Sequence, residues 1–140
     1  MSKRVLKGRK VHGGFAEGEA VVSRMGIAAY GSIDPYTGKV VERGHDLEGT
    51  EIAGKILVFK TGKGSSAWSI GAQASRFTGN NPKALVVTEA NPQVALGSVV
   101  MRVPAVSDCD RDPTEVIATG DWVVVDGDNG TVEVTERGET

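Results

Sequence analysis

The sequence predicts a mixed α/β domain built from short strands, tight turns and a few helices. Three observations support this fold class: glycine accounts for 19 of 140 residues, aromatic residues for only 5%, and β-branched residues gather in short runs. Frequent glycine between such runs is typical of turns that join strands, not of a helical bundle. The length fits one domain with a buried core, so we expect a single domain over residues 1–140.

The first third of the chain predicts two short strands and then a long loop. Apolar residues between Val5 and Val11 and at Ala20–Val22 are interrupted by glycines, which places a turn at Gly13–Gly14. Residues 26–51 show no periodic pattern, and we expect an extended loop there. A loop this long inside a compact domain is usually functional or part of an interface.

A strand, a glycine turn and a helix follow in direct succession. Residues 54–59 predict a buried strand, and residues 61–66 (Thr-Gly-Lys-Gly-Ser-Ser) predict a turn. Residues 67–77 predict a helix that ends at Gly79. Its apolar residues at helical spacing are Ala67, Ile70, Ala74 and Phe77.

Two further strand regions flank a short helix. Residues 84–87 (Ala-Leu-Val-Val) predict a buried strand, and Asn91-Pro92 opens a helix or turn that runs through Leu96. The apolar runs at 99–101 and 103–106 predict a third strand region.

The chain closes with a predicted β-hairpin. The strands at 122–125 and 131–134 flank Asp126-Gly127-Asp128-Asn129-Gly130, which is a strong turn sequence. We expect the polar tail at 135–140 to be frayed.

Composition and charge argue against several classes of function. The net charge of −2 indicates neither a nucleic-acid partner nor a membrane surface. The lone Cys109 cannot hold an iron–sulfur cluster by itself, and His12 and His45 lack metal-ligand spacing, so we expect no metal in this chain. No apolar run approaches bilayer length and no signal peptide opens the chain, so we expect a cytoplasmic protein.

A basic cluster lies near the N-terminus. It consists of Lys3, Arg4, Lys7, Arg9 and Lys10. We interpret it as a solvated arm or the edge of a sheet. Contact with an acidic partner or an anionic substrate is the alternative.

The glycine turn at 61–66 is the one segment that we expect to carry chemistry. A helix N-terminus presents unpaired N–H groups and partial positive charge, and Gly62 and Gly64 allow close approach to a ligand. Such a turn can bind an anion or stabilise a serine oxygen that loses its proton. The structural alternative is that Ser65 or Ser66 only caps the helix.

Two familiar motifs do not fit this turn. A Walker P-loop needs glycine at the position of Leu57 and a hydroxyl residue at the position of Gly64. A nucleophile elbow needs glycine at the position of Ala67.

Seven segments over about the whole chain carry a resemblance to a known family. They are Ala16-Glu17-Gly18-Glu19-Ala20, Asp34-Pro35-Tyr36-Thr37-Gly38, Gly44-His45, residues 54–59, Gly62-Lys63-Gly64-Ser65-Ser66, Pro82-Lys83-Ala84-Leu85-Val86 and the hairpin from Gly120 to Val134. Together and in this order they resemble the small-subunit, or swivel-domain, family of aconitase X. The resemblance implies a swivelling β/β/α fold like the mobile C-terminal domain of aconitase, and a separate large subunit that holds an iron–sulfur cluster.

The chemistry implied by this resemblance is dehydration of a small hydroxy acid at a site shared with the large subunit. A base removes a proton next to a carboxylate, and hydroxide leaves with the cluster acting as a Lewis acid. Archaeal relatives would imply mevalonate 5-phosphate as substrate, and bacterial relatives cis-3-hydroxy-L-proline. The small chain alone would be inactive, because its site would be open and wet.

The resemblance also implies roles for individual residues. Aconitase places its serine base in a Gly-Ser-Ser-Arg context, so Ser65 inherits the role of base. The rest of the oxyanion or substrate-binding turn is Gly62, Lys63, Gly64 and Ser66. Ala67 replaces the arginine, so Lys63, Arg76 or the partner would bind the substrate carboxylate.

Three further residues have two interpretations each. His45 is either a loop residue bonded to Asp46 or the backbone, or a residue on the substrate or subunit side. Asp34 either forms a turn by hydrogen bonding to its own backbone, or lies on the side that faces the substrate or the large subunit. Trp68 is either a partner contact or part of the core.

Two other functions remain open at this point. Thr61-Gly62 and the stretch from Gly120 to Gly127 also fit a phosphohistidine-type swivelling carrier, although no histidine lies in the turn. A purely structural partner without a catalytic residue is the third hypothesis.

Overall fold

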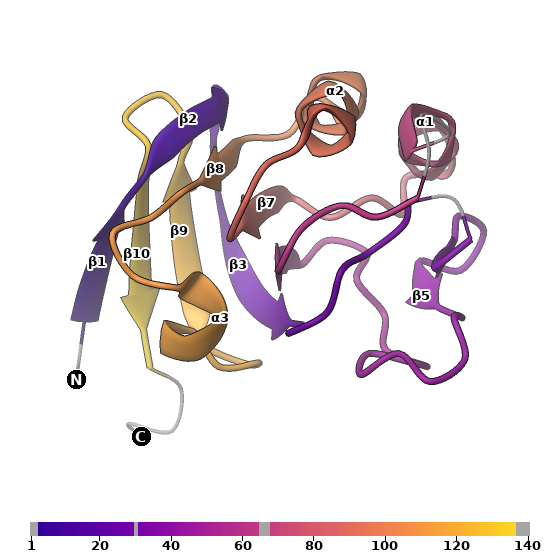
Figure 1. Ribbon diagram of the computed structural model, residues 1–140, viewed down its shortest axis with the longest axis horizontal. Helices are drawn as coiled ribbons and strands as arrows, with labels where there is room; N and C mark the ends of the chain where they lie inside the picture. The colour runs from indigo at the N-terminus through magenta and orange to yellow at the C-terminus, as the bar shows by residue number, and fades with distance from the viewer. Residues whose placement is uncertain (1–2, 30, 65–67, 137–140) are drawn as a thin grey trace.

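The computed structural model describes residues 3–29, 31–64 and 68–136, which form two β layers and one helical layer (Figure 1). One eight-stranded sheet within these residues has the order β1-β10-β9-β3-β6-β7-β8-β2. Its strands are β1 (Lys3–Lys7), β2 (Arg9–His12), β3 (Phe15–Val22), β6 (Ile56–Phe59), β7 (Ala84–Val87), β8 (Ala105–Ser107), β9 (Trp122–Asp126) and β10 (Thr131–Thr135). The β/β/α layering agrees with the predicted mixed α/β class.

The two ends of this sheet are joined through Gly8. β1 pairs with β10 at one end and β2 pairs with β8 at the other, yet only Gly8 separates β1 from β2. A Cβ on Gly8 would meet the Ser107 carbonyl oxygen at 2.5 Å, so glycine is needed where the chain crosses. The predicted single N-terminal strand is therefore two strands, and the sheet curls around a core.

Four parallel strands carry the centre of the molecule. β3 pairs with β6, β6 with β7, and β7 with β8, all in parallel. Every residue of β6 and β7 is buried, because one face meets the antiparallel layer and the other lies under helices. Val58 and Val86 pack toward Val123 and Val134, whereas Phe59 belongs to the core under the helices.

The helical layer consists of α1 (Trp68–Thr78) and α2 (Pro92–Met101), which pack side by side. Gly79, with φ of 77°, ends α1 as predicted. Two of the apolar residues at helical spacing, Ile70 and Phe77, are 60% and 85% exposed, so that spacing does not mark the buried face of α1. The buried residues of α1 are instead Trp68, Gly71, Ala72 and Ser75.

Several other elements differ from the sequence prediction. Val99–Met101 is the last turn of α2, not a strand, because helix packing overrides the β propensity of two valines. The predicted loop at 26–51 contains a small hairpin of β4 (Ile33–Asp34) and β5 (Lys39–Val40). A short helix, α3 (Pro113–Val116), was not predicted.

The predicted frayed tail was also partly wrong. Thr135 is the last residue of β10, and Glu136 accepts a 2.7 Å hydrogen bond from Arg4. Other members of the N-terminal basic cluster are paired as well, since Lys3 lies 3.4 Å from Glu133 and Lys10 lies 3.9 Å from Asp128. The basic cluster therefore lies on the end strands of the sheet, which agrees with the interpretation of a solvated arm or sheet edge.

Candidate functional site

The glycine turn lies where the parallel strands end. Thr61–Gly64 follows β6 at the carboxyl edge of β3, β6, β7 and β8, and leads toward α1. Ligands of open α/β sheets commonly bind at this edge. Ser65, Ser66 and Ala67 lie outside the described residues, so the roles of Ser65 and Ser66 stay predictions.

The loop that follows β3 holds the turn from one side. Ile27 N–H donates to the Thr61 carbonyl at 3.0 Å, and Lys63 N–H donates to the Ile27 carbonyl at 3.0 Å. The same carbonyl accepts the indole N–H of Trp68 at 2.9 Å. Trp68 is only 3% exposed, so its indole belongs to the core and anchors the first turn of α1.

The beginning of α2 holds the turn from the other side. The Asn91 side-chain N–H donates to the Gly62 carbonyl at 2.7 Å, and Gln93 Nε2 donates to the Gly64 carbonyl at 3.3 Å. A Cβ on Gly62 would meet Val94 Cγ2 at 2.5 Å. Gly64 has a φ of +98°, which favours glycine. Close packing thus requires glycine at position 62, and the backbone conformation favours glycine at position 64.

A charged pair lies on the turn itself. Lys63 Nζ is 2.6 Å from Glu42 Oε2, and both side chains are partly buried. The other oxygen of Glu42 accepts the Ser32 hydroxyl, and Ser32 Oγ accepts the Ala28 N–H at 3.0 Å. Hydrogen bonds from Lys63 and then Ser32 lower the pKa of Glu42 despite partial desolvation.

Sequence reasoning missed Glu42 and Ser32. Glu42 lies 21 positions before Lys63, in a segment without a periodic pattern. Only the fold of that segment brings the carboxylate to the turn. The long irregular segment at 26–51 was the one sequence signal for these residues. It indicates a functional or interface role for the segment but does not identify Glu42 or Ser32.

The two histidines hold loops in place. Leu47 N–H donates to His45 Nδ1 at 3.1 Å, so Nε2 carries the proton and donates to the Gly26 carbonyl at 3.0 Å. The side chain of His45 is fully buried, which fits the backbone-bonded interpretation. His12 bonds the Val103 carbonyl through Nδ1 at 2.9 Å. Neither histidine lies in the turn.

The structure separates two other candidates from the turn. Asp34 Oδ1 accepts the Tyr36 N–H at 2.9 Å and its carbonyl accepts the Gly38 N–H at 2.8 Å, so Asp34 forms a turn between β4 and β5. Arg76 lies in the last turn of α1. It is about 12 Å along the helix axis from Trp68, so Arg76 lies away from the turn, and its suggested role on the substrate or interface side stays a prediction. Lys63 is the predicted cation that lies at the turn.

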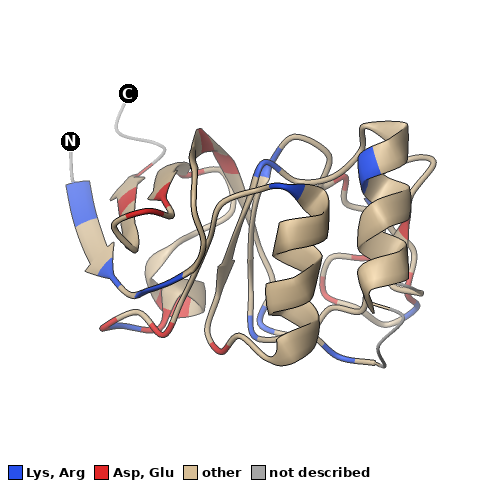
Figure 2. Ribbon diagram, turned by 90° about the horizontal axis from the view of Figure 1, so that it is seen from above, with Lys and Arg blue, Asp and Glu red and all other residues tan. Residues whose placement is uncertain are grey.

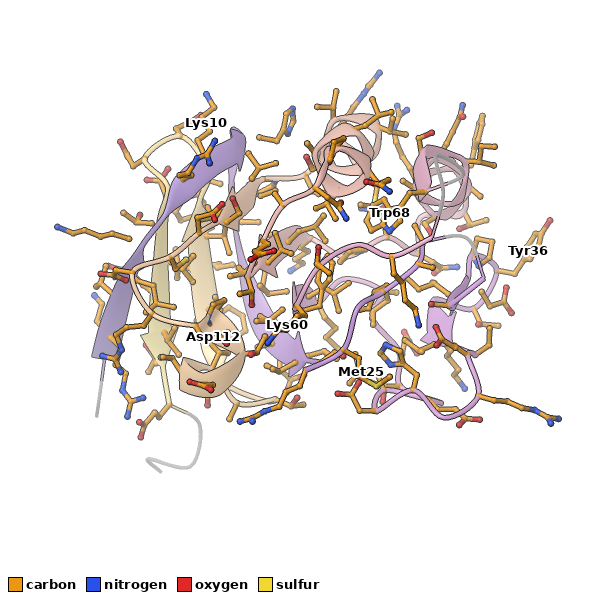
Figure 3. All side chains as sticks on the ribbon, in the orientation of Figure 1. Lys10, Met25, Tyr36, Lys60, Trp68 and Asp112 are labelled. Atoms are coloured by element: carbon orange, nitrogen blue, oxygen red, sulfur yellow. The ribbon has the colours of Figure 1, made fainter. Side chains whose placement is uncertain are left out.

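A second polar group occupies the same edge (Figure 3). Asp112 Oδ1 accepts the hydroxyls of Thr88 and Thr114 at 3.1 and 2.8 Å, and also caps α3 through Thr114 N–H. Burial raises the pKa of Asp112, but the bonds from Thr114 and Thr88 and the charge of Lys60 outweigh it and lower the pKa. These residues were not singled out from the sequence.

The described ranges offer no set of metal ligands. No group of three or more His, Cys, Asp or Glu in them lies close enough to hold an ion. Burial, followed by the charges of Asp110 and Asp108, raises the pKa of the Cys109 thiol to about 11, which disfavours the thiolate that a metal binds. No helix in the described part of the chain is long and apolar enough to cross a membrane.

Comparisons with known proteins agree with this architecture. A family model described as the aconitase X swivel domain matches residues 5–134. The phosphomevalonate dehydratase small subunit of Thermococcus kodakarensis is 45% identical over 134 residues, covering 96% of this chain and 98% of the relative. The subunit of the same name from Methanosarcina mazei is 41% identical over 134 residues, covering 96% and 93%. The crystal structure of Thermococcus kodakaraensis aconitase X in its holo-form superposes with a TM-score of 0.90 at 44% identity, covering 95% of this chain and 99% of that one.

Proposed function

Because the chain belongs to the aconitase X swivel-domain family, we propose that it is the small subunit of a dehydratase that acts on mevalonate 5-phosphate. One observation carries this proposal: relatives named phosphomevalonate dehydratase small subunit match almost the whole chain at 41% and 45% identity. These names favour the phosphorylated substrate over cis-3-hydroxy-L-proline. The proposed reaction removes water from the hydroxy acid.

Ser65 is the proposed base. A serine hydroxyl becomes basic only when its alkoxide is stabilised, and each pKa unit takes about 1.4 kcal/mol of preferential stabilisation. The start of a helix and a nearby cation are suitable sources. In support, the preceding residues Gly62 to Gly64 are held on both sides by hydrogen bonds, and Lys63 brings an ammonium group to the same turn.

A large partner subunit completes the proposed site. The helical layer supports a partner, because α2 contains no charged residue and α1 contains only Arg76 (Figure 2). Leu96 and Val99 on α2 and Ile70 and Phe77 on α1 are all at least half exposed. Exposed apolar side chains on two neighbouring helices with almost no charge are typical of a surface that contacts another protein. We assign the implied iron–sulfur cluster to the partner, since the described residues of this chain offer it no ligand set.

The test is reconstitution with the large subunit from the same organism. We expect the complex to dehydrate mevalonate 5-phosphate and each subunit alone to be inactive. Substrate loss and product mass are followed by liquid chromatography and mass spectrometry, with cis-3-hydroxy-L-proline as the comparison substrate. A complex that turns over only the hydroxyproline would contradict the proposed substrate. Full turnover by a complex with Ser65→Ala and Ser66→Ala would contradict the proposed base.

A further inference from the structure

The most developed polar network at the turn runs from Lys63 into the segment that precedes β6. Lys63 Nζ binds Glu42 Oε2 at 2.6 Å, Glu42 Oε1 accepts the Ser32 hydroxyl, and Ser32 is 1% exposed. Charge-assisted bonds of this length are about twice as strong as neutral ones and fix geometry. The network therefore fixes the direction in which Lys63 leaves the turn.

Lys63 keeps hydrogen-bonding capacity after this contact. An ammonium group has three N–H donors, and Glu42 is the acceptor that Lys63 Nζ meets among the described residues. The side chain is 41% exposed, so its remaining donors can reach a ligand at the carboxyl edge. A fixed ammonium with spare donors is suited to an oxyanion, whether carboxylate or phosphate.

We propose that Glu42, held by Ser32, is a positioning residue that aims Lys63 at an oxyanion of the substrate. This inference rests on the proposed function and adds a role for the irregular segment before β6. Glu42 itself touches no substrate in this proposal. It acts by fixing the ammonium of Lys63 two residues before Ser65.

The chain offers a matched control at the other end of β6. Lys55 Nζ lies 2.6 Å from Glu19 Oε1, the same distance as in the Lys63–Glu42 pair. The side chains are 35% and 38% exposed, close to the 41% and 27% of Lys63 and Glu42. Lys55 precedes β6 and Lys63 follows it, so Glu19→Gln removes a comparable pair far from the turn.

The experiment is a double-mutant cycle in the reconstituted complex with mevalonate 5-phosphate. We expect Glu42→Gln to lower kcat/KM by about tenfold to a hundredfold, as for a misplaced binding group. Glu19→Gln should change kcat/KM by less than about twofold. The thermal unfolding midpoint should shift equally in Glu42→Gln and Glu19→Gln. If Glu42 acts through Lys63, then Lys63→Met with Glu42→Gln is no slower than Lys63→Met alone.

The source of the oxyanion is read from a second substrate. Unphosphorylated mevalonate distinguishes the two possible oxyanions. If Glu42→Gln lowers kcat/KM only for the phosphorylated substrate, Lys63 binds the phosphate. If it lowers kcat/KM for both substrates, Lys63 binds the carboxylate. Unchanged kcat/KM in Glu42→Gln, or additive losses in the cycle, would overturn the inference alone. An inactive wild-type complex would overturn the proposed function and this inference together.

Discussion

The side chain of Asn91 joins the start of α2 to the carbonyl of Gly62 at 2.7 Å, while its other atom, Oδ1, accepts the N–H of Val94 at 3.1 Å. One amide thus caps a helix and holds the glycine turn. Both contacts lie at the carboxyl edge of the parallel strands. The stability of α2 and the geometry of the turn are coupled through this residue.

Replacing Asn91 separates the two contacts. Asn91→Asp keeps an oxygen for the helix cap but loses the N–H donor to Gly62, whereas Asn91→Ala loses both. We expect Asn91→Ala to destabilise the fold by about 1 kcal/mol and Asn91→Asp by less, because aspartate is an equally good cap. Both should lower the turnover of the reconstituted complex. Chemical denaturation and steady-state kinetics check this, and normal turnover in Asn91→Asp would contradict the role of the tether.

Gly97 makes room for Trp68. A Cβ at position 97 would overlap the indole ring at Cζ3 and Cε3, and the ring is fully packed between the helices. We expect Gly97→Ala to destabilise the fold by about 1–3 kcal/mol, the usual cost of overpacking. Chemical denaturation measures the loss.

The matched control is Gly18→Ala in β3. There the new Cβ would meet its nearest atom, Lys83 Cδ, at an ordinary 3.6 Å. We expect a change within about 0.5 kcal/mol. Equal losses of stability in Gly97→Ala and Gly18→Ala would show that the loss comes from replacing a glycine in general, and not from the fit of Trp68.

The sequence predicted those parts of the fold that depend on local pattern. The buried strands around Val58 and Val86, the stop at Gly79 and the C-terminal hairpin all follow from short-range rules, and the structure confirms them. The buried face of α1 does not follow from the sequence of α1, because the space for the Trp68 ring depends on Gly97 of another helix. The helical spacing of apolar residues along α1 includes Ile70 and Phe77, which the structure leaves exposed.

The same division applies to the candidate site. A glycine turn before a helix is visible in the sequence, and Lys63 was identified from it. Glu42 and Asn91 were not, since both reach the turn through tertiary folding from distant segments. Local pattern thus finds the turn, while only long-range packing identifies the residues that hold it.

Cys109 gives a prediction that can be tested on the isolated chain. Its thiol pKa is raised from 9.0 to about 11, mainly by burial. Only the thiolate is alkylated readily, so the rate of iodoacetamide labelling should reach half of its maximum near pH 11 in the native chain. In denaturant the labelling rate should reach half of its maximum near the ordinary thiol pKa of 9.0. A raised acid pKa adds stability that is present below the unfolded pKa and is lost as pH rises through the folded pKa. A native labelling profile identical to the denatured one would contradict this burial.

Asp112 gives the opposite pH dependence. Its pKa is lowered below the ordinary 3.8 by bonds from Thr114 and Thr88 that outweigh desolvation. A lowered carboxyl pKa contributes stability above the unfolded pKa, and this contribution disappears as pH falls through the folded pKa.

Asp112→Ala removes the cap of α3 and should cost about 1 kcal/mol at pH 7. Denaturation at pH 7 and pH 3 then compares the two chains, with Glu115→Ala on the exposed side of α3 as control. The difference in unfolding free energy between wild type and Asp112→Ala should narrow at pH 3, because pH 3 lies below the ordinary pKa of 3.8 at which the carboxyl of the unfolded chain takes up its proton. A difference that widens at pH 3 would contradict the lowered pKa.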